Sequence, residues 1–206
     1  MANDLATLRV RLALALRDDA FAVWTSTELG DILTSASAQL YPRVAVPMAV
    51  PIYPLVDDEE DYALPAGILE ISRIDLALVA DDTLLMPLPG GTWEIAGDPM
   101  GSTGRLFVNR SYSRVDHYLI VHGYGSYDLT TTLPPDIYVP FVLATARAEA
   151  LRVMVPKRAA FEKWMTINQK SNVSVNEISG MISQAENEAE RQRARMKTWR
   201  KPKPAR

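Results

Sequence analysis

The segment from Leu133 to Met154 constrains the fold of this 206-residue chain more than any other. It opens with prolines, which are tolerated where a helix begins because the first turn has no intrahelical partner for its N–H groups. An alanine-rich run with only three charged residues follows. A helix this apolar must be covered on several sides. The sequence therefore predicts a helix that begins between Asp136 and Pro140 and forms the centre of a helical bundle.

Two shorter amphipathic helices are predicted near the N-terminus. The first has leucines at helical spacing, at Leu5, Leu8, Leu12 and Leu16, and we expect it to end at Asp18-Asp19. The second follows Thr25 and Glu28, which have the spacing of a capping box. Its apolar stripe consists of Leu29, Ile32, Leu33, Ala36 and Leu40.

A long helix is predicted near the C-terminus. Ser174 and Glu177 form a second capping box. A narrow apolar stripe follows, made of Ile178, Met181, Ile182, Ala185 and Ala189, and it fades where basic residues begin.

Between these helical regions the apolar pattern changes to a period of two. The predicted strands are Ile68–Val79, Thr83–Pro87, Thr92–Ile95, Arg105–Asn109 and His117–His122, with glycine-rich turns between them. We expect an α+β fold, in which a helical bundle carries an inserted small antiparallel β module and a long C-terminal helix and arm. The helical body would comprise residues 1–45 and 134–206, and the β module residues 50–130.

An acidic run, Asp57-Asp58-Glu59-Glu60-Asp61, precedes the first of these strands. Consecutive acids point in several directions and no second set of ligands is visible, which favours a solvated loop over a metal site.

Charge is distributed unevenly along the chain. The net charge is −3, yet residues 191–206 hold eight basic residues and no acid. The rest of the chain is therefore more acidic than the net charge suggests. There is no cysteine, which excludes disulfides and thiolate metal sites. No apolar stretch approaches the length of a membrane span, so we expect none.

No catalytic motif is recognisable. His117 and His122 are an odd number of positions apart on one predicted strand and would face opposite sides of the sheet. Glu149 and Arg147 on the central helix are interpreted as a structural salt bridge. The sequence contains no nucleophile motif, phosphate loop or metal-binding helix motif. We therefore expect no enzymatic activity, no cofactor and no metal.

Three short motifs carry a resemblance to a known family. They are Trp24-Thr25-Ser26-Thr27-Glu28-Leu29, Tyr62-Ala63-Leu64-Pro65 and Leu133-Pro134-Pro135-Asp136. With their order along the chain, they resemble the head-to-tail adaptor (connector) proteins of tailed bacteriophages. The resemblance implies a structural virion protein in the neck, assembled in the host cytoplasm as a ring of typically twelve copies between portal and tail. It implies as partners the portal, tail or tail-terminator (nozzle) proteins, and packaged DNA that passes through the channel without sequence-specific contacts.

The basic arm is the predicted portal-binding segment. Its candidate contacts are Arg191, Arg193, Arg195, Met196, Lys197, Trp199, Arg200, Lys201, Lys203 and Arg206. Alternatives stay open: a nucleic-acid-binding protein that uses the basic C-terminal helix, another neck or tail-completion protein, or an enzyme. Strong salt dependence of DNA affinity would favour the first. A deep pocket with convergent polar groups would favour the last.

Overall fold

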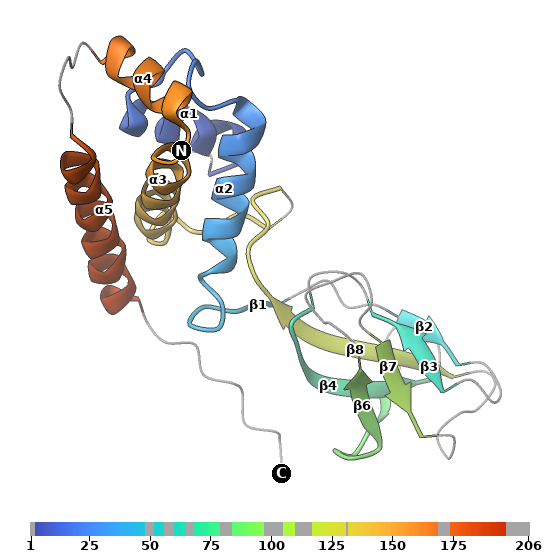
Figure 1. Ribbon diagram of the computed structural model, residues 1–206. Helices are drawn as coiled ribbons and strands as arrows, with labels where there is room; N and C mark the ends of the chain where they lie inside the picture. Colours follow the sequence, from blue (N-terminus) through green and yellow to red (C-terminus); the bar gives the residue numbers. More distant parts are fainter. Residues whose placement is uncertain are drawn as a thin grey trace. The chain divides into compact units, whose positions relative to one another are not determined.

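The computed structural model describes residues 3–47, 52–55, 60–64, 68–78, 84–96, 105–109, 117–130, 132–168 and 174–196 (Figure 1). Within these residues the chain has helices and two small antiparallel sheets, which confirms the predicted α+β class. It separates into two compact units. A helical unit comprises residues up to Val44 and from Tyr127 through the C-terminal helix, and a β unit spans Ala45–Ser126.

The helical unit contains α1 (Leu5–Leu16), α2 (Ser26–Ala38), α3 (Val139–Met154), α4 (Arg158–Ile167) and α5 (Val175–Arg195). Helix α3 begins inside the predicted window, with Pro140 in its first turn. It packs against each of the other four helices and so is the central helix of the bundle. Its buried side chains are Val139, Phe141, Val142, Ala144, Ala146, Ala148, Ala150, Leu151 and Met154.

The start of α1 is fixed to the segment that leads into α3. Asn3 donates from Nδ2 to the carbonyl oxygen of Pro134 at 2.9 Å and to Oδ1 of Asp136 at 2.7 Å. The backbone N–H of Leu5 donates to the carbonyl of Leu129 at 3.1 Å. These bonds join two segments that are far apart in the sequence, so the start of α3 is held by more than its own prolines.

Both predicted capping boxes are confirmed. Thr25 Oγ1 accepts from the backbone N–H of Glu28 at 3.1 Å, and Glu28 Oε2 accepts from the N–H of Thr25 at 2.9 Å. Ser174 and Glu177 make the same reciprocal pair at the start of α5. Each box satisfies two N–H groups that the first turn of a helix leaves without partners.

Replacing Glu28 by glutamine should lower the free energy of unfolding by an amount that depends on pH. The hydrogen bond from the backbone of Thr25, with the Thr25 side chain and then Lys157 adding to it, lowers the pKa of Glu28. A depressed carboxyl pKa contributes stability above the pKa of the unfolded chain, and this is lost as the pH falls through the folded pKa. Because the Glu28 side chain is 44% exposed and solvent screens its interactions, we expect a loss of only about 0.5 kcal/mol at pH 7, which vanishes in acid and is measured by urea unfolding. Asp31→Asn on the same helix is the control, and an equal loss at both pH values would contradict the prediction.

The β unit consists of two sheets that share one core. The first pairs β1 (Val46–Pro47) and β2 (Ile52–Pro54) with β8 (Tyr118–Gly125), followed by β4 (Glu70–Ala77) and β5 (Leu84–Pro87). The second has the order β3 (Asp61–Ala63), β7 (Arg105–Val108), β6 (Trp93–Ala96). Every pairing is antiparallel. Both sheets contribute to one apolar cluster, which includes Ile74, Leu119 and Val121 from the first and Tyr62, Leu106 and Val108 from the second.

One part of the acidic run is not a solvated loop. Asp61 lies in β3 and forms a two-point ion pair with Arg105 on the neighbouring strand β7, with Nε–Oδ1 at 2.7 Å. Hydrogen bonding from the Arg105 side chain lowers the pKa of Asp61. The prediction for this residue was wrong because a cross-strand partner cannot be seen from sequence neighbours alone. Residues 57–59 lie outside the described residues.

Candidate interaction surface on the C-terminal helix

Helix α5 covers α3 through a narrow contact. Its buried side chains are Ile178, Ala185 and Ala189, and Met181 and Ile182 pack at the edge of the same core. The alanines of α3 and α5 permit close approach of the two backbones. The other side chains of α5 are mostly polar. A shallow groove runs along each side of α5 where it meets α3.

In the groove on one side of α5, both arginines are paired with carboxylates. Arg152 on α3 pairs with Glu186 on α5 and, at 3.3 Å, with Glu149 on its own helix. Arg193 pairs with Glu190 at 3.4 Å. Each cation that lines this groove therefore faces a carboxylate of the same chain.

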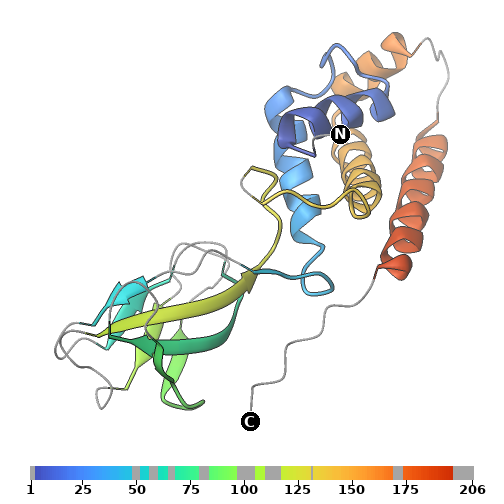
Figure 2. The same cartoon turned by 180° about the vertical axis from the view of Figure 1, so that it is seen from behind.

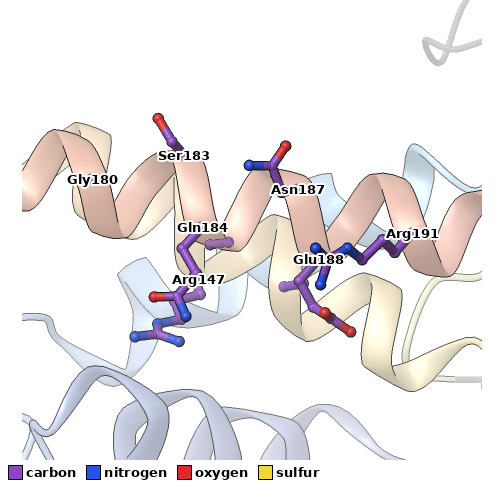
Figure 3. Close-up of a pocket in the computed structure, with 9 residues that line it drawn as sticks. Arg147, Gly180, Ser183, Gln184, Asn187, Glu188 and Arg191 are labelled. Atoms are coloured by element: carbon purple, nitrogen blue, oxygen red, sulfur yellow. The ribbon is translucent and has the colours of Figure 1, made fainter.

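The groove on the other side has a different charge arrangement (Figure 3). Its volume is about 460 Å³, and it is lined by Ala144, Arg147, Gly180, Ser183, Gln184, Ala185, Asn187, Glu188 and Arg191. In the described part of the chain, Arg147 and Arg191 have no carboxylate partner, and the buried Nε of Arg147 has no hydrogen bond. Glu188 accepts instead from Gln192 Nε2 at 2.5 Å. We call this the Arg147 groove.

The interpretation of Arg147 and Glu149 as a salt bridge was wrong. Residues two apart on a helix point to different sides, whereas residues three or four apart share a side. Glu149 accordingly pairs with Arg152, and Arg147 lines the opposite groove. Spacing along one helix does not show where another helix crosses it, and α5 crosses α3 between Arg147 and Arg152.

The predicted portal-binding residues divide into three groups. Arg191, Arg193 and Arg195 lie exposed on the last two turns of α5. Met196 is 6% exposed and belongs to the core of the helical unit, so it packs within its own chain. The remaining candidates, Lys197, Trp199, Arg200, Lys201, Lys203 and Arg206, lie outside the described residues.

A second polar cluster lies in the β unit. Asp75 on β4 is 1% exposed, and its Oδ2 lies 2.8 Å from His122 Nε2 and 2.6 Å from Arg73 Nη2. The guanidinium of Arg73 and the imidazole of His122 thus partner one oxygen of a buried carboxylate, which burial alone would disfavour. Strand β8 begins at Tyr118, so His117 precedes it. The described residues hold no group of three acidic or histidine side chains that could bind a metal.

Comparisons with known proteins found a likeness at the level of structure. No protein-family profile and no curated protein sequence matches the chain. A solved structure described as "Neck of empty GTA particle computed with C6 symmetry" contains a similar chain, at 15% sequence identity and a TM-score of 0.34. The match covers 76% of this chain and 87% of that one. Among the helices described, none is both long and apolar enough to cross a bilayer.

Proposed function

We propose that this protein is a structural component of a virion neck, where copies form a head-to-tail adaptor ring between the portal and the tail and line the DNA channel. The observation that carries the proposal is the place of the three adaptor-like motifs. The first motif spans the start of α2, the second begins inside β3, and the third precedes α3. Its role is assembly, with no catalytic step, cofactor or metal.

The first motif organises the turn into α2. Trp24 is 3% exposed and lies in the core of the helical unit, while Thr25 and Glu28 cap the helix. The third motif precedes α3, where Asn3 binds Pro134 and Asp136. These contacts fix where α2 and α3 begin.

The second motif belongs to the β unit. Tyr62 lies in β3, is 5% exposed and packs its ring against Tyr53 with a centroid distance of 5.9 Å. Leu64 belongs to the same apolar cluster. The motif therefore supplies core residues of the β unit.

In the proposed assembly the basic arm binds the portal. Exposed ion pairs contribute only about 0–1 kcal/mol each and weaken with salt. A buried tryptophan removes about 150–250 Å² from water, which corresponds to roughly 4–6 kcal/mol as an upper bound. The cations would therefore steer the arm, and Trp199 would anchor it.

The test uses the portal protein of the same virion and the full-length chain. The informative truncation removes residues 197–206, since Met196 is part of the helical core and must stay. We expect rings on the portal by electron microscopy with the intact chain. Truncation and Trp199→Ala should abolish or weaken binding, whereas Lys201→Glu/Lys203→Glu should mainly slow association. Rings that form unchanged without residues 197–206 would refute the role of the arm. The absence of any ring on the portal would refute the proposed function.

A further inference from the structure

We propose that the Arg147 groove is the contact surface between neighbouring copies of this chain, and that it receives the exposed face of α2 from the next copy with Asp31 opposite Arg147. This inference rests on the proposed ring and identifies the residues that would join its subunits.

The two sides of α5 differ in charge. On one side, Arg152 and Arg193 already form ion pairs with carboxylates of the same chain. Along the other side, Arg147 and Arg191 have no carboxylate partner among the described residues, and only one acid, Glu188, is present. A partly buried guanidinium is stabilised most by a carboxylate that displaces water and accepts a charge-assisted hydrogen bond from it. The groove therefore favours a carboxylate from outside the chain.

The shape of the groove also favours a helix as its occupant. Ala144, Gly180 and Ala185 contribute small side chains or none, and a Cβ added at Gly180 would meet nothing within 4 Å. An open groove between two helices is the kind of surface into which a ridge of a third helix packs. The stretch of α5 from Gly180 to Arg191 is about 16 Å long at 1.5 Å per residue.

The exposed face of α2 has matching properties. Thr27, Asp31 and Ser35 are exposed and follow one another at a spacing of four residues, which makes a single ridge of short side chains. The ridge is about 12 Å long and so fits within the groove. Asp31 has no hydrogen bond or ion pair among the described residues. It is thus an available acid on a regular helix, at the middle of the ridge.

The two surfaces lie on different sides of the same unit. Both views show α3 between α2 and α5 (Figures 1 and 2). An interface that joins two different patches is heterologous, and repeating it by rotation generates a ring when the rotation closes. A contact between α2 of one copy and the Arg147 groove of the next is therefore of the type that a ring requires.

A nucleic-acid phosphate is the competing occupant. Glu188 would repel it, and the groove offers two cations where phosphate tracking commonly uses a longer row. A protein carboxylate on a short side chain complements both the positive charge of the arginines and the shape of the groove. The experiment below separates the two.

The first test uses site-specific disulfide cross-linking. The chain has no cysteine, so only the introduced cysteines can form cross-links. One preparation carries Thr27→Cys and a second carries Asn187→Cys, and both are exposed positions. We expect covalent dimers when the two are mixed and assembled on the portal, and none when either is used alone. Thr166→Cys on α4, mixed with either, is the control and should stay monomeric. If rings form and the mixed pair gives no more dimer than the control, the interface is wrong while the proposed function stands.

The second test reverses charge and fills the groove. Arg147→Glu should reduce ring formation about tenfold, and adding Asp31→Arg should restore most of it, since the pair is then reversed. Lys163→Glu on α4 applies the same charge change elsewhere. Gly180→Leu should block assembly, whereas Gly180→Ala should preserve it, and circular dichroism should show both folded. Failure of Asp31→Arg to restore assembly would overturn the pairing. DNA binding that is salt-dependent, lost in Arg147→Glu and unaccompanied by cross-links would assign the groove to phosphate instead.

Discussion

Replacing Trp164 by alanine is expected to lower the free energy of unfolding of the helical unit by about 3–5 kcal/mol. Trp164 is 1% exposed and is among the largest fully buried side chains of the described chain. Its indole Nε1 donates to the carbonyl oxygen of Leu16 at 2.9 Å. The ring therefore fills the core next to the end of α1, and its N–H satisfies a carbonyl of the last helical turn.

The measurement is urea unfolding followed by the helical circular dichroism signal, because the substitution removes a fluorophore. Trp164→Phe separates the two contributions. It keeps most of the ring volume and loses the hydrogen bond to Leu16, so we expect a smaller cost of about 1–2 kcal/mol. Ile167→Ala, at 40% exposure on the same helix, is the matched control for shortening an apolar side chain. A cost for Trp164→Ala no larger than that of Ile167→Ala would contradict the packing of Trp164 in the core.

Helices could be predicted from the sequence because their signals are local. Leu8, Leu12 and Leu16 are buried at the predicted spacing, and so are Leu29 and Leu33. Both capping boxes depend on residues three apart, which the sequence shows directly. The position of α3 followed in the same way from its prolines and alanines.

Strand positions could also be predicted, but their partners could not. The period of two located segments that overlap β4 to β8. It did not show that β8 pairs with β1, β2 and β4, since these pairings join residues far apart in the chain. The cross-strand pairs Asp61–Arg105 and Asp75–His122 depend on that topology. Neither could be found before the register was known.

The candidate site was predicted only in part. The basic end of α5 is visible as a run of charge, whereas the Arg147 groove arises from how α5 crosses α3. One signal was present in the sequence: Gly180 lies inside a helical pattern, where glycine costs about 1 kcal/mol relative to alanine. In the structure this position is open, with nothing within 4 Å of an added Cβ. A helical glycine without a turn or a close backbone contact is consistent with a surface that another helix approaches.

Replacing Asp18 by alanine is expected to cost about 2–4 kcal/mol, although the sequence suggested only that this residue ends a helix. The side chain is 1% exposed and accepts three backbone N–H groups, from Ala22 at 2.8 Å, Val23 at 2.9 Å and Trp24 at 3.0 Å. Alanine would leave the buried N–H of Trp24 without a partner, and hydrogen bonds to a charged acceptor are among the stronger ones.

The neighbouring Asp19 provides the control for this prediction. It is exposed and has no hydrogen bond among the described residues, so Asp19→Ala should change the urea midpoint little. Asp18→Asn should lie between the two, because its amide keeps one acceptor oxygen. The three bonds fix the turn that sets the direction of α2, and α2 carries Asp31. If the proposed ring contact is correct, Asp18→Ala should therefore reduce ring assembly even at temperatures where the protein remains folded. Normal assembly by a folded Asp18→Ala variant would show that the direction of α2 does not govern the contact.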